Sequence, residues 1–134
     1  MGLAVLAGCV MGGVVARTAY PPDNVLLETS ETVIGQPITY PPGQAKVTAA
    51  LVAMEPGQET GWHRHEVPLF VFMLEGELTV DYGPDGTRSY RAGDAFVEAL
   101  GSPHDGRNTG SSPVKLLAVW MGAEGAANTV PLSN

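Results

Sequence analysis

From Val25 onward, the chain alternates short apolar stretches with turns rich in glycine and proline. Apolar and polar residues that alternate with a period of two are typical of half-buried β-strands. No stretch has a convincing helical period. The pattern predicts an all-β domain, a single antiparallel barrel or jelly roll. The expected strands are 25–34, 45–54, a piece around 63–65, 69–74, 78–82, 87–91, 95–99 and 114–121.

The first 19 residues follow a different pattern. Residues 2–16 carry no charged side chain and are mostly Leu, Val, Ala, Gly and Met. Such a run is shorter than the roughly 20 residues of a membrane-spanning helix, but it fits the apolar part of a secretory signal. We therefore expect residues 1–19 to be an apolar leader, signal-peptide-like or lipoprotein-like, and residues 20–134 to form the barrel domain.

The route of export stays open at this stage. Val14-Val15-Ala16 offers small residues for cleavage near Arg17, whereas Leu6-Ala7-Gly8-Cys9 resembles a bacterial lipobox in which Cys9 is acylated. No Lys or Arg precedes the run, and it continues beyond Cys9. We expect a periplasmic or otherwise exported protein, or a lipoprotein, with membrane attachment only through this segment. The alternative is a cytoplasmic protein with this segment packed on the domain.

Composition narrows the class of protein. Hydrophobic residues make up 44% of the 134 residues and charged residues 16%, which is typical of one packed globular domain. The formal net charge is −7. Because nucleic-acid phosphates repel such a surface, we expect no nucleic-acid partner. With a single cysteine, the fold cannot depend on an internal disulfide.

The chain contains three histidines, and their positions suggest one metal site. His63 and His65 are two residues apart, and His104 follows Gly101-Ser102-Pro103. Side chains at i and i+2 of a strand point to the same face, so both imidazoles of the pair can reach one ion. Imidazole is the commonest protein ligand for transition metals.

Two motifs around these histidines resemble those of the cupin superfamily. The first is Gly57-x5-His63-x-His65 followed by Leu74-Glu75-Gly76, within 57–76. The second is Gly93-x5-Ala99-x-Gly101-x2-His104-x3-Asn108, within 93–108. The resemblance covers roughly residues 25–122. It is strongest to small single-domain cupins grouped with quercetin dioxygenases, the cupin 2 conserved-barrel proteins. It implies that His63, His65 and His104 are metal ligands.

The chain departs from the family pattern at one ligand position. Leu69 stands where cupins usually carry a glutamate ligand. A replacement carboxylate is Glu98, because the strand phase that points Phe96 inward also points Glu98 inward. We assign Glu98 as a candidate catalytic base or extra metal ligand. The alternative is a solvated, outward Glu98 on a strand shifted by one residue.

The resemblance implies a metal-dependent, dioxygenase-type enzyme that acts on a small organic anion. We expect a divalent metal, Fe by preference, with Mn, Ni, Cu or Zn as alternatives. Two other functions stay open: a redox-neutral isomerase, lyase or hydrolase, and a non-catalytic cupin that binds a small molecule or a metal. Phe70 and Phe72 occupy the outer strand phase, and we therefore expect a homodimer.

Overall fold

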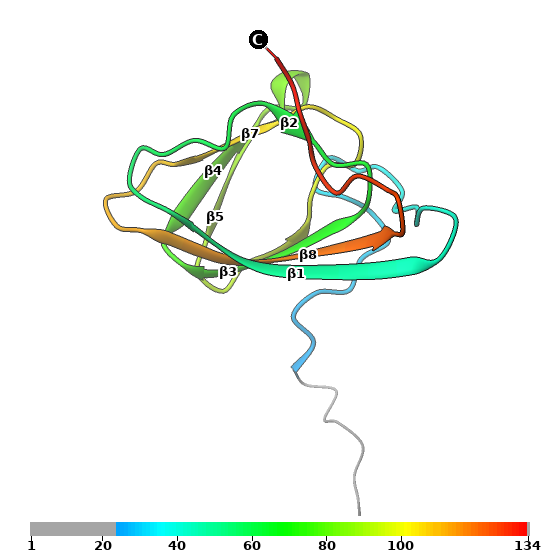
Figure 1. The fold of residues 1–134 in the computed structure, drawn as a ribbon. Coiled ribbons are helices and arrows are strands. Elements are labelled where there is room, and N and C mark those ends of the chain that lie inside the picture. Colours follow the sequence, from blue (N-terminus) through cyan, green and yellow to red (C-terminus); the bar gives the residue numbers. More distant parts are fainter. Residues whose placement is uncertain (1–23, 134) are drawn as a thin grey trace, which may run out of the picture.

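The computed structural model describes residues 24–133, which form short β-strands joined by turns (Figure 1). The leader expected at residues 1–19 lies outside the described residues. Between residues 24 and 133, no helix is both long and apolar enough to cross a membrane. The elements are β1 (Ala45–Met54), β2 (His63–Arg64), β3 (Leu69–Glu75), β4 (Glu77–Asp81), the 3-10 turn η2 (Gly83–Asp85), β5 (Thr87–Arg91), β6 (Ala95–Val97), β7 (Asp105–Asn108), β8 (Val114–Ala123) and β9 (Val130–Pro131).

The strands form three antiparallel sheets around one interior. The largest has the order β1-β8-β3-β6, the second has the order β5-β4-β7, and β2 pairs with β9. Figure 1 shows the two larger sheets facing each other, with β2 and the C-terminal segment at the top of the barrel. The all-β barrel expected from the sequence pattern is confirmed.

Alternation along the strands decides which side chains reach the interior. In β3, Leu69, Val71 and Met73 are buried, whereas Phe70 and Phe72 are only half-buried on the outer side. Residues of β4 meet them from the facing sheet, Phe96 of the neighbouring β6 packs beside them, and the resulting apolar core also includes Met54. Burial of this surface is the main stabilising contribution to a domain of this size.

Three segments differ from the expected pattern. Residues 25–34 form no strand, and only an isolated bridge joins Glu31 to Pro37. There the Thr29 side chain donates to the Glu31 carbonyl and accepts from its amide, which favours a local turn over a strand ladder. Strands β7 and β9 were not expected. β7 is polar in sequence (Asp105 to Asn108), and β9 has only two residues.

One turn requires glycine for two reasons. Gly76 joins β3 to β4 with a positive φ of 79°. A Cβ at this position would lie 2.5 Å from the Pro113 carbonyl oxygen. The close approach of backbone to backbone explains the residue type.

Candidate metal centre

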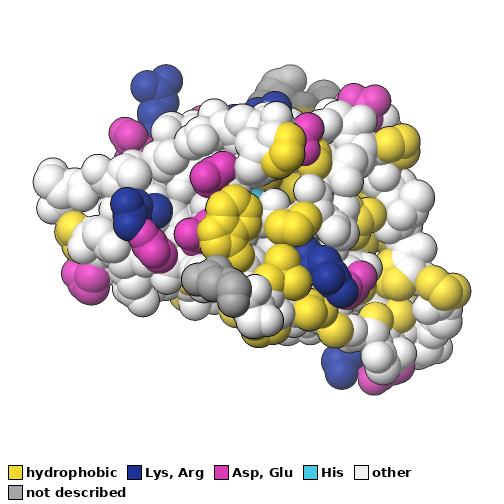
Figure 2. Space-filling model, turned by 90° about the horizontal axis from the view of Figure 1, so that it is seen from above, with side chains coloured by type: hydrophobic (Ala, Val, Ile, Leu, Met, Phe, Trp, Pro, Cys, Tyr) yellow, Lys and Arg dark blue, Asp and Glu magenta, His cyan; other side chains and the backbone are white. Residues whose placement is uncertain are grey.

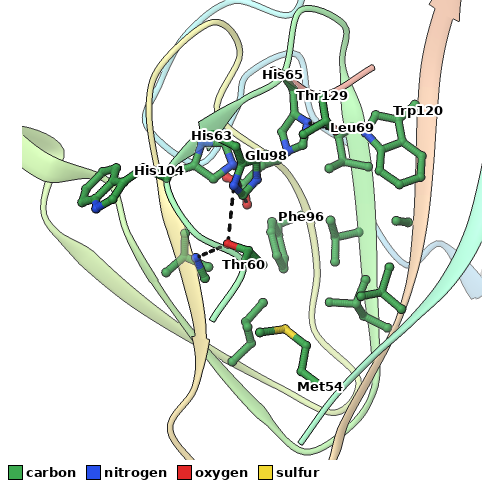
Figure 3. Close-up of a pocket in the computed structure, with 18 of the residues that line it drawn as sticks. Met54, Thr60, His63, His65, Leu69, Phe96, Glu98, His104, Trp120 and Thr129 are labelled. Carbon is green, nitrogen blue, oxygen red and sulfur yellow. Dashed lines mark hydrogen bonds and ion pairs between the residues drawn. The ribbon is translucent and has the colours of Figure 1, made fainter. Parts of the chain in front are cut away.

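Backbone pairing brings the three histidines to one place. His63 lies on β2, His65 follows that strand, and His104 immediately precedes β7. His63 and His104 form an antiparallel bridge, and their amides donate to each other's carbonyls at 3.0 and 2.9 Å. Ligand nitrogen atoms of all three lie within 4.8 Å of one another. Figure 3 shows the rings converging at one end of the cavity.

Hydrogen bonds orient the three rings for metal binding. The Nδ1 atoms of His63, His65 and His104 lie 2.7, 3.1 and 2.9 Å from backbone carbonyl oxygens. A carbonyl only accepts, so each Nδ1 donates, and the lone pair is left on Nε2. Among the described residues, the buried Nε2 of His104 has no hydrogen-bond partner. This donor set fits a divalent transition metal.

The histidines are held in the neutral form that a metal requires. Burial lowers the pKa of His63 and of His104, and it lowers the pKa of His65 to about 3. Neutral imidazoles offer lone pairs without first losing a proton, so metal does not compete with protons near neutral pH. The three histidines are therefore positioned for metal binding.

The usual acidic ligand is missing from β3, but an acid enters from the neighbouring chain segment after β6, where the Glu98 amide donates to the Leu69 carbonyl at 2.9 Å. Leu69 is buried in the cavity wall and has no ligand atom. The Glu98 side chain points inward, because Oε2 lies 3.9 Å from Nε2 of His104 and Oε1 accepts from the Ala99 amide at 2.8 Å. Burial raises the pKa of Glu98. The inward strand phase is thus the observed one, and the role of Glu98 stays a prediction.

A buried tyrosine pair behind Glu98 was not expected from the sequence. The hydroxyls of Tyr82 and Tyr90 lie 3.0 Å apart, and the Tyr90 ring stacks on Phe96 with centroids 3.8 Å apart. Hydrogen bonding to the Tyr82 side chain lowers the pKa of Glu98, against the larger effect of burial. The alternation of Leu78, Val80 and Tyr82 is the signal that would have placed Tyr82 inside.

The cavity is small and mostly apolar. It has a volume of about 280 Å³, below the roughly 300–1,000 Å³ that is usual for ligand sites. The histidines and Glu98 form one end of it (Figure 3), and Trp62 and Thr129 also line it. Figure 2, seen from the mouth side, shows only a trace of histidine surface between hydrophobic side chains. The apolar walls are formed by Val52, Met54, Leu69, Val71, Leu78, Val80, Phe96, Leu116, Ala118 and Trp120.

Three further side chains near the histidines have other positions in the fold. Glu66 is exposed, and its carboxylate pairs with Arg64 at 2.7 Å. Met54 and Met73 are buried core residues.

The fold and the site agree with the comparison to protein families. The cupin domain model matches residues 50–120, more than half of the chain. The chain belongs to the cupin family. No curated protein matches the chain.

Several solved structures are similar to the chain. Oxalate decarboxylase of Bacillus subtilis, which contains Mn(II) centres, is 25% identical with a TM-score of 0.53, over 64% of this chain and 24% of that protein. The DMSP lyase DddQ of Ruegeria pomeroyi DSS-3 is 27% identical with a TM-score of 0.56, over 63% and 42%. Oxalate decarboxylase of Lactobacillus farciminis, in complex with formate, is 23% identical with a TM-score of 0.56, over 66% and 27%, and supports the fold alone. The chain thus spans less than half the length of these proteins.

Proposed function

We propose that this cupin is a metal-dependent enzyme that acts on a small organic anion, with Glu98 as the residue that takes or returns a proton. The observation that carries the proposal is the position of Glu98. Its carboxyl group is buried in an apolar cavity, 3.9 Å from Nε2 of a candidate metal ligand. A buried acid beside such a cluster is costly for the fold, and perturbed acids of this kind concentrate at catalytic sites.

Charge and size support a small anion as the substrate. Three neutral imidazoles leave both positive charges of a divalent ion uncompensated, and Glu98 offsets at most one of them. No Lys or Arg lines the cavity between residues 24 and 133, so a second anionic group on the substrate would find no partner. The apolar walls favour a short hydrophobic body attached to one anionic head.

We favour an oxygen-using, dioxygenase-type reaction with iron as the metal. When bound, the ion supplies Lewis-acid polarisation of substrate oxygen atoms, and iron adds redox chemistry with dioxygen. The chain itself orients the substrate against the histidines and excludes water with its apolar walls. We assign Glu98 as the base that takes a proton from the substrate.

A redox-neutral cleavage is the second candidate. Proton transfer by a buried acid also suits a lyase or a decarboxylase, and the similar structures include an oxalate decarboxylase with Mn(II) centres and a DMSP lyase. Both candidates use the same groups of this chain. They differ in whether dioxygen is consumed.

Metal identity and oxygen dependence test the proposal together. Untagged protein is analysed for bound elements and then loaded with Fe, Mn, Ni, Cu or Zn. It is next offered small carboxylates, diketones, thiols and sulfonium compounds, with and without oxygen. Turnover that consumes oxygen supports the dioxygenase, and turnover without oxygen supports the lyase. In either case Glu98→Gln should retain metal but lose turnover by about 100-fold or more.

One outcome would overturn the enzymatic proposal. If the metal-loaded protein binds such anions stoichiometrically but converts none, it is a binding protein. Loss of binding in His104→Ala would then assign that binding to the histidine cluster.

We also propose that residues 1–19 direct export. Mass measurement of the mature protein from a bacterial host tests this proposal directly. Cleavage near Arg17 supports a signal peptide, and an acylated Cys9 at the new N-terminus supports a lipoprotein. An intact N-terminus in the cytoplasm would overturn both.

A further inference from the structure

The chain after β8 returns across the mouth of the barrel. In Figure 1 this segment, coloured red, passes over the top of the molecule beside β2. We call residues 128–132 the C-terminal strap. Its β9 pairs with β2, and the Leu132 amide donates to the Trp62 carbonyl at 3.0 Å. Thr129 and Pro131 line the cavity.

The strap contacts one of the three candidate ligands directly. His63 and His104 each donate from Nδ1 to a carbonyl two residues earlier in their own loops, Gly61 and Ser102. His65 instead finds both acceptors on the strap, the Asn128 carbonyl and the Thr129 hydroxyl, each at 3.1 Å. The orientation of His65 therefore depends on a segment more than 60 residues away in sequence.

We propose that the C-terminal strap positions His65 for metal binding, with Thr129 as the positioning side chain. The inference rests on the proposed metal centre but on neither proposed reaction. A hydrogen bond from Nδ1 fixes the ring plane and keeps the lone pair on Nε2. Without the strap, Nδ1 of His65 faces water, and the ring is free to rotate and change tautomer.

The strap is weakly held by its other contacts. Its ladder with β2 has two residue pairs, and Thr129 and Pro131 are exposed overall. Segments with few buried contacts open at low cost. Because coupling between two events is reciprocal, a closed strap raises metal affinity and bound metal holds the strap closed.

Cobalt binding measures the effect of the strap on metal affinity. Co(II) is titrated into untagged, metal-free protein, with its visible absorption as the readout and a chelator competing for the ion. Thr129→Val should lower the affinity about 10-fold, and removal of residues 128–134 about 100-fold, the range found for partners of metal-bound histidines. Thr129→Ser keeps the hydroxyl and should rescue binding. Ser133→Ala, at an exposed position beyond the strap, is the matched control.

Hydrogen exchange measures the reciprocal effect, in which bound metal holds the strap closed. In the parent protein, Co(II) should slow exchange of the Leu132 amide, and this protection should shrink in Thr129→Val. If Thr129 only stabilised the strap, its replacement would not change the effect of metal on exchange of the Leu132 amide. If the truncated chain does not fold, Thr129→Val and Thr129→Ser still test the role of the strap.

Two results would contradict the proposal in different ways. The role of the strap would be overturned if Thr129→Val and Thr129→Ser bound Co(II) with the affinity and absorption of the parent protein, and if metal did not affect exchange of the Leu132 amide. The metal centre would then remain intact. A parent protein that binds no Co(II) would overturn the metal centre and the strap proposal together. Absence of turnover would affect neither measurement.

Discussion

The Glu98 carboxyl oxygen Oε2 lies 3.9 Å from Nε2 of His104, and both side chains are almost completely buried. The two groups come from opposite ends of one short segment, since Glu98 follows β6 and His104 precedes β7. An acid and a metal-ligating nitrogen thus share one small, apolar space. This arrangement has consequences for stability as well as for chemistry.

Glu98→Gln should stabilise the metal-free protein at neutral pH. Burial raises the pKa of Glu98 above its usual 4.5, so ionisation of the carboxyl group opposes folding. The protonated carboxyl group therefore contributes fully to the free energy of unfolding below pH 4.5. This contribution is lost as the pH rises through the raised pKa of the folded protein. The melting temperatures of variant and parent should converge near pH 4 and separate toward pH 8. Glu66→Gln, on the surface, is the control. A variant less stable than the parent at pH 8 would contradict this account.

Bound metal should stabilise the parent protein but not His104→Ala. A ligand at about 100 times its dissociation constant adds about 2.7 kcal/mol to the free energy of unfolding. His104→Ala removes one of three nitrogens, so its stability should not respond to Zn(II) or Co(II) at the same concentration. Urea unfolding with and without metal measures this difference. An equal response in both proteins would place the metal elsewhere.

The tyrosine pair should behave as one unit in a double-mutant cycle. Tyr82→Phe leaves the buried Tyr90 hydroxyl without its partner, and such a loss costs about 1–3 kcal/mol. Tyr90→Phe should cost a similar amount, and the double variant less than the two costs added together. Chemical unfolding of the four proteins gives the coupling energy. Additive costs would show that the two hydroxyls do not interact.

Gly76→Ala should destabilise the protein more than Gly35→Ala. Both positions have positive φ, which costs a non-glycine residue about 1–2 kcal/mol. At Gly76 the new methyl group would also press on the Pro113 carbonyl, and such overpacking adds about 1–3 kcal/mol. At Gly35, whose φ is 78°, nothing lies within 4 Å of the added methyl group. Equal losses at the two positions would show that the turn relaxes.

We propose that the outer face of the large sheet forms a homodimer, and Leu51→Lys should disrupt it. Among the described residues, β1 pairs only with β8 and leaves its other edge open. On its outer face, Val47 is 68% and Leu51 72% exposed. An exposed apolar face beside an unpaired strand edge favours association with a second copy of the chain. Sedimentation should show a dimer for the parent and a monomer for Leu51→Lys, with Ala126→Lys as control. A monomeric parent would refute the proposal.

The local parts of the site follow from the sequence, and the long-range parts do not. Two-residue spacing places His63 and His65 together, and strand phase places Glu98 inside with Phe96. The tyrosine pair depends on how β4 and β5 align, which alternation within one strand does not determine. The strap is recognised only by its contacts with His65, because two residues of β9 are too few to form a pattern. Residues 25–34 read as a strand, but the structure shows local turns there.

Both tryptophans of the chain, Trp62 and Trp120, line the cavity. The Trp120 ring centroid lies 6.5 Å from that of His65. Indole fluorescence of the unlabelled protein therefore comes only from the walls of the site. A paramagnetic ion at the histidines should quench this emission, and an apolar ligand should shift its wavelength. The two tryptophans are therefore intrinsic fluorescence probes of metal and ligand binding at the site.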